Sequence, residues 1–207
     1  MKTIDRIKKK WKYQNKLVLL FDGIAKFGIK FYPFIVFVED VLHTKIKKRK
    51  ECTVRYLSKN DIEELVILRE ENMRQYYVDN FNRGNYALAI LINGKISCYT
   101  WFSTKLFNTK LIERKLEENE AYLFDMFTSP DFRGKGLAPY LRQYVYKELK
   151  KLSVKKAYSI TAYVNNPAIR FKEKLKAKKC ELYWLITFFN KWKFRWKIKN
   201  YKDEIKK

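Results

Sequence analysis

The sequence predicts a mixed α/β domain in which a central sheet is flanked by helices, with an N-terminal extension of helix and strand before it. Three observations support this fold class. Hydrophobic residues make up 47% of the 207-residue chain, enough to build a core. Short β-branched and aromatic runs alternate with stretches of helical periodicity. The first fifty residues differ in composition, so we expect a basic extension over 1–50, the domain over 51–200 and a frayed tail over 201–207.

The extension is predicted to contain one helix and one strand. Apolar residues recur at near-helical spacing over residues 4–31, although Gly23 and Gly28 weaken the helix and Pro33 ends it. Residues 34–38 form a run typical of a strand. The extension would lie on an anionic membrane surface, pack on the domain or form a dimer interface. We favour packing, because residues 34–38 resemble a buried strand.

The first half of the domain is predicted as a strand, two helices and a hairpin. Ser58 is a suitable N-cap for the first helix. Asn93 and Gly94 lie between two apolar runs, which is the short pattern most typical of a β-hairpin. These elements cover residues 52–57, 60–72, 73–81, 86–92 and 96–103.

The second half is predicted to alternate strand and helix before a final hairpin. Residues 106–119 are polar and fit a loop or a short helix. Pro167 stands in the first turn of the last helix, where its missing N–H costs little. Aromatic and basic residues alternate over 191–197, and we expect the aromatic face to pack in the core. The other elements cover residues 121–128, 134–152, 157–164, 167–177, 182–189 and 192–198.

Charge and cysteine content limit the classes of function. The net charge of +24 favours anionic partners, including phosphorylated cofactors, membranes and nucleic acid, unless much of it is solvated surface. Cys52, Cys98 and Cys180 lack disulfide or zinc spacing, so we expect buried free thiols and no metal site, and we expect His43 to be structural. No signal peptide or membrane span is recognisable, which favours a cytoplasmic location, or a peripheral one at the inner membrane surface.

The segment of residues 130–138 carries the clearest chemical signal. It follows a predicted buried strand and opens a helix, so unpaired N–H groups and the helix dipole favour an anion there. Gly134 and Gly136 lack a Cβ and allow close approach to the backbone, while Arg133 and Lys135 supply positive charge. A pyrophosphate fits such a site.

The motif Arg133-x-x-Gly136-x-Ala138 resembles the coenzyme A signature of the GNAT superfamily of N-acetyltransferases. Residues 120–141 resemble that family's central strand, loop and helix, and residues 165–171 resemble its next block. The resemblance implies acetyl-CoA as acyl donor, with its pantetheine arm between two splayed strands. Asn165 would contact the cofactor, cap a helix, or do both. The cofactor residues implied are Phe127, Thr128, Arg133, Gly134, Lys135, Gly136, Leu137, Ala138 and Asn165.

Direct transfer to an amine requires a general base, and two carboxylates are candidates. Asp125 lies in the middle of an apolar strand, where burial would raise its pKa towards a useful range. Glu120 resembles the base position of bacterial ribosomal-protein N-terminal acetyltransferases. Their structural alternatives are a hydrogen-bond acceptor for Asp125 and a solvated end of the acidic stretch for Glu120. We favour Asp125, because an apolar strand tolerates an acid only for a reason.

The general acid departs from the family pattern. Lys172 stands where family members commonly have a tyrosine, and Lys176-Ala177 replaces a usual Gly-Phe pair. Lys172 would stabilise or protonate the leaving thiolate, or it would be a plain cation near the cofactor. Tyr140 and Tyr163 are alternative donors, and the thiolate would also leave without an acid.

The acceptor is less well specified. We expect a primary amine on a small molecule, such as an amino sugar, because aromatic residues near cations suit a sugar. A protein N-terminus or lysine is the alternative, followed by a non-catalytic module that binds coenzyme A or nucleic acid. No nucleic-acid motif is visible, so nucleic acid ranks last. The aromatic and cationic residues considered are Arg69, Arg74, Tyr76, Tyr77, Trp101, Trp184, Trp192 and Trp196.

Overall fold

The computed structural model describes residues 21, 23–41, 46–109, 111–189 and 191–201. The chain divides into two compact units, one of residues 1–37 and 160–207 and the other of residues 38–159. Strands β1 (Ile29–Asp40) and β8 (Lys156–Ala162) contribute residues to both units.

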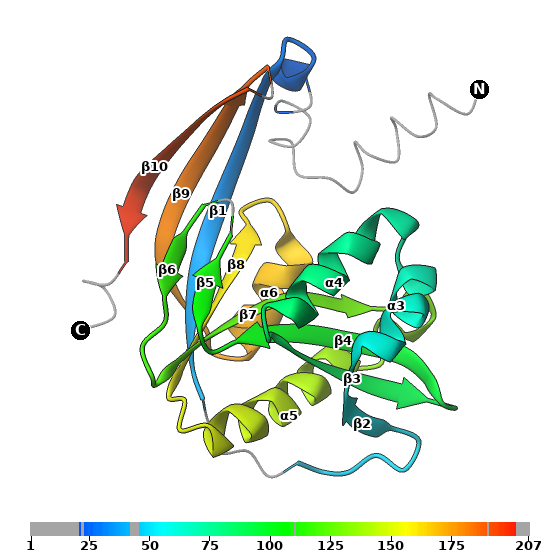
Figure 1. Ribbon diagram of the computed structural model, residues 1–207. Helices are drawn as coiled ribbons and strands as arrows, with labels where there is room; N and C mark the ends of the chain where they lie inside the picture. The colour runs from blue at the N-terminus through cyan, green and yellow to red at the C-terminus, as the bar shows by residue number, and fades with distance from the viewer. Residues whose placement is uncertain (1–20, 22, 42–45, 110, 190, 202–207) are drawn as a thin grey trace. The chain divides into compact units, whose positions relative to one another are not determined.

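The unit of residues 38–159 is an open sheet with helices on both faces. Its strands are joined in the order β8-β7-β4-β3-β2, with a parallel pair between β7 and β8 and antiparallel pairs elsewhere. A mixed sheet flanked by helices confirms the predicted fold class (Figure 1). The elements are β2 (Thr53–Tyr56), α3 (Ile62–Leu68), α4 (Arg74–Asn82), β3 (Tyr86–Ile92), β4 (Lys95–Ser103), β7 (Glu120–Thr128) and α5 (Leu137–Lys151).

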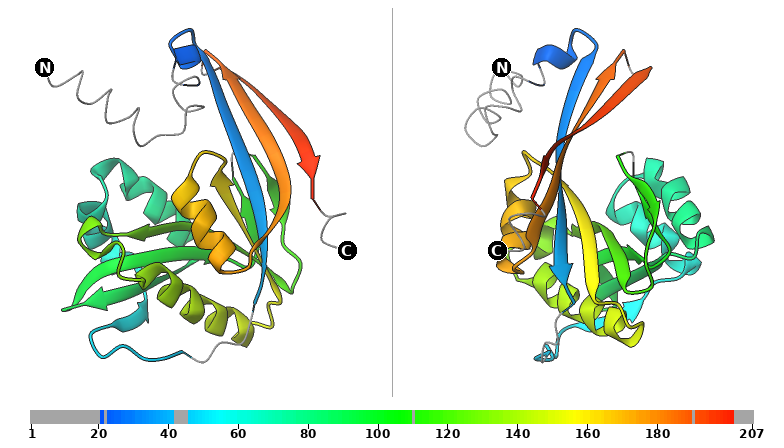
Figure 2. Two further views of the ribbon diagram at one scale, coloured as in Figure 1. Left: turned by 180° about the vertical axis from the view of Figure 1, so that it is seen from behind. Right: turned by 90° about the vertical axis from the view of Figure 1, so that its left-hand side faces the viewer.

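Alternate residues of strand β3 pack on opposite faces of this sheet. Side chains alternate between faces along a strand. Leu88 and Ile90 pack in the cluster that contains the buried face of α5. Ala87 and Ala89 pack in the cluster that contains α3 and Tyr77 of α4. Helix α5 therefore covers one face, and α3 with α4 covers the other (Figures 1 and 2).

Local signals in the sequence are confirmed at both predicted positions. The Ser58 hydroxyl accepts the Asn60 N–H at 3.3 Å, and the Asp61 carboxylate accepts the Ser58 N–H at 2.8 Å, which forms a capping box. Asn93 and Gly94 have positive φ angles of 52° and 76°, as the two-residue turn between β3 and β4 requires.

The prediction of a loop or short helix over residues 106–119 was wrong. This segment contains a small antiparallel pair, β5 (Leu106–Asn108) and β6 (Glu113–Lys115). Phe107 is 1% exposed, and its ring stacks on Tyr122 with centroids 4.4 Å apart. The Thr109 hydroxyl accepts the Ile112 N–H at 2.9 Å and shapes the turn. One buried aromatic and a side-chain hydrogen bond stabilise strands too short to show a period in the sequence.

The other unit contains the extension's strand. Its elements follow the order β10-β9-β1-β8, with α6 (Asn166–Lys174), β9 (Lys178–Phe188) and β10 (Trp192–Asn200). The predicted strand over 34–38 is part of β1, but β1 already begins at Ile29, so Pro33 lies within a strand and does not end a helix. The Pro33 carbonyl accepts the Tyr163 N–H at 2.8 Å.

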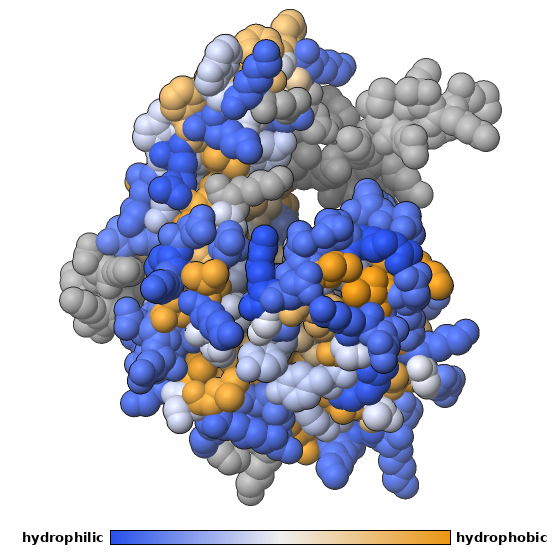
Figure 3. Space-filling model, viewed as in Figure 1, coloured by the Kyte–Doolittle hydropathy of each residue, from blue (hydrophilic) through white to orange (hydrophobic). Residues whose placement is uncertain are grey.

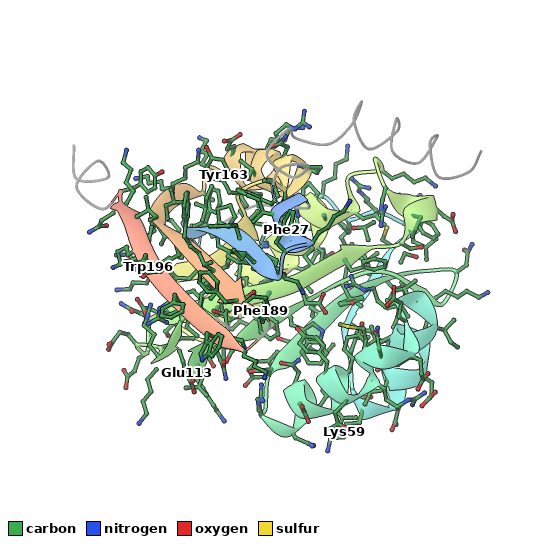
Figure 4. All side chains as sticks on the ribbon, turned by 90° about the horizontal axis from the view of Figure 1, so that it is seen from above. Phe27, Lys59, Glu113, Tyr163, Phe189 and Trp196 are labelled. Carbon is green, nitrogen blue, oxygen red and sulfur yellow. The ribbon has the colours of Figure 1, made fainter. Side chains whose placement is uncertain are left out.

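The residue before β1, Gly28, contacts the residue after β9, Phe189. Gly28 has a φ of 80°, and its carbonyl accepts the Phe189 N–H at 2.7 Å. The Phe189 ring lies so close that a Cβ on Gly28 would stand 2.5 Å from it, so only glycine fits there. Figure 4 labels Phe189 and also Phe27, the residue before Gly28.

The aromatic face predicted to pack in the core is exposed. Trp192, Phe194 and Trp196 on β10 are each about half exposed, and Phe194 stacks on Trp196 with centroids 5.8 Å apart. Strand β10 is the outermost strand of its order and pairs with β9 alone (Figure 4). The alternation therefore reflects an edge strand whose aromatic side chains pack on each other.

Several expectations concern residues that the structure does not describe. The predicted helix falls mostly on residues 1–20, and His43 and residues 202–207 also lie outside the described residues. Among the cysteines, Cys98 and Cys180 are buried and outside any disulfide as expected, whereas Cys52 is half-buried. Within the described residues, every helix is too short or too polar to cross a lipid bilayer.

Candidate active site

The loop between β7 and α5 has the backbone geometry of an anion site. Helix α5 begins at Leu137, and its N-cap, Gly136, has a left-handed φ of 71°. No side chain among the described residues caps this end, so its first N–H groups keep their capacity to bind an anion. Gly134 has a φ of 78°, which a side chain rarely adopts.

Cations surround this loop. The Arg133 guanidinium donates to the Thr128 carbonyl at 3.2 Å, which holds Arg133 against the end of β7. The Lys135 ammonium lies 4.9 Å from the centre of the Phe132 ring. A third cation, Arg49, comes from the segment before β2 and donates to the Lys135 carbonyl at 2.9 Å.

Arg49 also borders a cavity at the first turn of α5. Its guanidinium lies 3.2 Å from the position that a Cβ on Gly136 would occupy and 5.0 Å from the centre of the Tyr140 ring. The Tyr140 hydroxyl accepts the Arg49 N–H at 3.1 Å, so the two residues fix each other. The cavity has a volume of about 460 Å³, and its lining includes Gly136 and three cations, Lys47, Lys48 and Arg49, against one carboxylate, Glu51. Its positive lining suits phosphate groups.

Strand β7 carries a bulge at Asp125. Trp101 on β4 pairs with Phe124, whereas Tyr99 pairs with Phe127, so two residues of β7 face one residue of β4. Asp125 has a positive φ of 43°, uncommon for a residue within a strand. A bulge of this kind re-aims a side chain and is over-represented next to active sites.

The Asp125 carboxylate is mostly enclosed and has two partners. Its side chain is 13% exposed. The Tyr99 hydroxyl donates to it at 3.3 Å, and an Arg69 guanidinium nitrogen lies 3.9 Å away. Burial raises the pKa of Asp125 more than the charge of Arg69 and the hydrogen bond from Tyr99 lower it. A carboxylate with a raised pKa is a stronger base, which suits proton abstraction.

Asp125 lines a pocket of about 320 Å³. Three rings, those of Tyr76, Tyr122 and Phe124, contribute to its wall. Leu106 adds a further apolar side chain. The polar part comes from the end of α4, the start of β3, the end of β4 and the β5 region: Asn80, Arg83, Asn85, Ser103, Lys105, Asn108 and Thr109. An apolar wall with a few polar groups and one perturbed acid is typical of a small-molecule site.

The described ladder between β7 and β8 covers only three residue pairs and ends at Tyr122 and Tyr158. Strand β7 continues to Thr128 and remains paired with β4. The last part of β7, which carries Asp125, Phe127 and Thr128, therefore has a ladder on one side only among the described pairs.

Comparison with known proteins identifies the family. The profile of the acetyltransferase (GNAT) family matches residues 53–176, more than half of the chain. The chain belongs to the GNAT acetyltransferase family. No curated protein sequence matches it.

Solved structures show the same fold. A GNAT-family protein from Novosphingobium aromaticivorans is similar with a TM-score of 0.55 at 17% identity, over 77% of this chain and 66% of that one. A conserved protein of unknown function from Staphylococcus epidermidis has a TM-score of 0.59 at 10% identity, over 82% and 67%. A tandem GNAT protein from the clavulanic acid biosynthesis pathway has a TM-score of 0.57 at 12% identity, over 80% and 53%. The chain thus spans between half and two thirds of the length of these proteins.

Glu120 and Asp125 lie in different surroundings on strand β7. Arg114 donates to Glu120 at 2.6 Å, and the Glu117 N–H donates at 3.3 Å. Burial alone would raise the pKa of Glu120, but these hydrogen bonds outweigh it and hold the pKa below the usual value. Glu120 is therefore a weaker base than Asp125, and it is not among the residues that line the pocket.

The remaining predicted GNAT residues divide between the two units. Leu137 and Ala138 are the first two residues of α5, where Leu137 is buried in the core and Ala138 packs against it. Asn165 belongs to the other unit, where its side chain accepts the Ala168 N–H at 3.2 Å, so its capping role is confirmed. Lys172 is buried in that unit, with its ammonium 5.3 Å from the centre of the Phe37 ring. Cofactor contact by Asn165 and thiolate stabilisation by Lys172 stay predictions.

Other candidates from the sequence have structural roles. Tyr77 and Trp101 are fully buried in the core. The Arg74 guanidinium donates to both Glu63 and Glu71, so its charge is already paired. Tyr140, considered as a proton donor, supports Arg49. Sequence reasoning missed the polar wall of the pocket, because its residues come from the ends of α4 and β4, from turns and from β5, and no periodic pattern marks them as one surface.

Proposed function

We propose that this protein transfers an acetyl group from acetyl-CoA to a primary amine of a small molecule bound in the pocket at Asp125. One observation carries the proposal: strand β7 presents a mostly enclosed carboxylate with a raised pKa to a pocket, and the same strand leads directly into the left-handed glycine loop. A proton acceptor and an anion site on one continuous segment suit direct transfer in a ternary complex.

The residues of the loop fit the diphosphate of acetyl-CoA. Gly134 and Gly136 keep side chains out of the way, and Arg49, Arg133 and Lys135 supply charge. When bound there, acetyl-CoA supplies the thioester. We expect the backbone at Phe127 or Thr128 to donate to the developing oxyanion.

The chemistry then requires one proton acceptor. The amine nitrogen attacks the thioester carbonyl carbon, a C–N bond forms, and the C–S bond breaks with release of the thiolate. Asp125, directly or through one water, takes the proton that the nitrogen loses. The hydrogen bond from Tyr99 and the charge of Arg69 hold the carboxylate in place for this step.

Calorimetric titration with acetyl-CoA tests the cofactor half of the proposal. We expect binding by the unaltered protein and none by Gly136→Asp, because an acidic side chain at a left-handed position would block and repel the diphosphate. Gly94→Asp is the control, since Gly94 also has a positive φ but lies in a distant hairpin turn with open space around it. Equal binding by both variants, or no binding by the unaltered protein, would refute the assignment.

Turnover tests the catalytic half. Release of the coenzyme A thiol in the presence of a primary amine should be detectable with the unaltered protein. A protein that binds acetyl-CoA but releases no thiol with any amine would favour a non-catalytic module.

A further inference from the structure

The pocket at Asp125 contains two cations whose charge the proposed chemistry does not use. Arg83 follows the end of α4, and Lys105 follows the end of β4. The Lys105 ammonium lies 3.6 Å from the position that a Cβ on Gly84 would occupy, next to Arg83 in the chain. Both cations therefore line the same pocket.

Neither cation has an ion-pair partner among the described residues of this unit. Two other arginines of this unit are neutralised: Arg55 pairs with Asp61 at 2.6 Å, and Arg142 pairs with Glu39 at 2.8 Å. The carboxylate one helical turn before Arg83 belongs to Asp79, which accepts a hydrogen bond from Gln75 at 2.8 Å. Two positive charges that line one pocket, neither of them in an ion pair among the described residues, favour an anionic ligand group.

Neutral polar groups lie beside these cations in a fixed arrangement. The Asn80 side chain donates to the Tyr76 carbonyl at 2.8 Å, and the Asn85 side chain donates to the Asn80 amide oxygen at 2.8 Å. Asn108 and Thr109 line the same pocket. Fixed amides and a hydroxyl beside aromatic rings suit the hydroxyl groups and apolar face of a sugar-like molecule.

We infer that the acceptor is a small hydroxylated amine that also carries an anionic group, and that Arg83 and Lys105 bind this group. The inference rests on the proposed function, since it assigns the amine end of the acceptor to Asp125. The pocket of about 320 Å³ suits a molecule of monosaccharide size. Phosphate and carboxylate share the required chemistry, and the choice of probes separates them.

The test compares three amines that differ in one charged group: glucosamine, glucosamine 6-phosphate and glucosaminic acid. Each is titrated calorimetrically into the full chain saturated with coenzyme A. We expect one or both charged probes to bind on the order of tenfold or more tightly than glucosamine, because charge-assisted hydrogen bonds are about twice as strong as neutral ones. Preference for glucosamine 6-phosphate would identify a phosphate, and preference for glucosaminic acid would identify a carboxylate.

Two matched double variants localise the effect. In Arg83→Gln/Lys105→Gln the preference should disappear while glucosamine and coenzyme A still bind. In Lys59→Gln/Lys95→Gln, which removes the same charge from residues that do not line the pocket, the preference should persist. Dependence on salt should also fall in the first variant alone.

Three results would overturn the inference. They are equal affinities of the unaltered protein for charged and neutral probes, a preference that survives in Arg83→Gln/Lys105→Gln, and binding of no probe by protein that does bind coenzyme A. In each of these the proposed cofactor site stands. Failure to bind coenzyme A at all would overturn both the proposed function and this inference.

Discussion

The buried charge of Asp125 lowers the stability of the fold, and the same carboxylate is the proposed general base. Burial disfavours its charged form, so the pKa of Asp125 in the folded protein lies above its value in the unfolded chain. The free energy of unfolding therefore decreases as the pH rises through the pKa of the folded protein, because Asp125 must then be charged in an enclosed site. Asp125→Asn removes this cost and keeps a residue type that tolerates positive φ. We expect the variant to unfold at a higher temperature than the unaltered protein at neutral pH, with kcat/KM lower by roughly 10²–10⁴-fold.

The dependence of activity on pH distinguishes a general base at Asp125 from a purely structural carboxylate. Activity of the unaltered protein should fall as pH decreases through the raised pKa, because the protonated carboxyl cannot accept a proton. Asp125→Asn should lack this acidic limb. Normal activity in the variant, or an unchanged limb, would exclude Asp125 as the base.

Lys176 is a second residue in a disfavoured conformation. Its φ of 59° is left-handed, and it follows the end of α6 at the position where the family commonly has glycine. Lys176→Gly should therefore raise the free energy of unfolding by roughly 0.5–1 kcal/mol. Lys174→Gly, inside the last turn of the same helix, should lower it by a similar amount. Chemical denaturation of both variants checks the opposite signs.

At the scale of elements, the N-terminus of α5 depends on a segment far away in the sequence. Arg49 lies before β2, yet it donates to the Lys135 carbonyl beside the helix start. We expect Arg49→Ala to weaken acetyl-CoA binding by roughly three- to tenfold, as loss of one exposed cation near phosphate groups. Lys50→Ala, in the same segment but outside the cavity lining, should bind normally. Equal losses would point to net charge rather than position.

Long periodic elements and specific turn residues were predictable from the sequence. The hairpin at Asn93 and Gly94 and the cap at Ser58 agree with local rules. Helix α5 begins at Leu137, later than the predicted start at Gly134, because Gly134 and Gly136 both have left-handed φ angles and belong to the loop. The loop residues were also predictable, because a strand, two glycines and a helix follow one another directly. Asp125 was predictable as an acid in an apolar strand.

Features that depend on distant contacts were not predictable. The bulge that turns Asp125 into the pocket arises from its pairing with β4, and no residue in β7 marks it. Arg83 and Lys105 are separated in the sequence and line one pocket only because Lys105 lies beside the turn at Gly84. Strand β10 has the alternation of a half-buried strand, but its position at an edge decides its exposure.

At the scale of the whole molecule, one buried ion pair connects segments 103 residues apart. Arg142 of α5 donates to Glu39 of β1 at 2.8 Å, and the Tyr146 hydroxyl also donates to Glu39. All three side chains are buried. Arg142→Met leaves a buried carboxylate without its cation and should cost about 3–5 kcal/mol of stability.

Two further variants make this prediction specific. Arg142→Met combined with Glu39→Leu should regain most of the lost stability, because both charges are then absent. Glu63→Gln, which breaks an exposed pair with Arg74, should leave the unfolding midpoint almost unchanged. A double variant as unstable as the single one would show that the pair itself, and not the isolated charge, governs stability.

The high positive charge has a consequence for the open edge of β10. Hydrophilic residues dominate the face seen in Figure 3, and the chain carries a net charge of +24. The outer backbone of β10 has no neighbouring strand in the described order, and its exposed rings offer an adhesive surface to a second copy. We expect mutual repulsion between like-charged copies to keep this edge from nucleating aggregates. Colloidal stability should therefore depend on ionic strength, and concentrated protein should stay dispersed best in low-salt buffer.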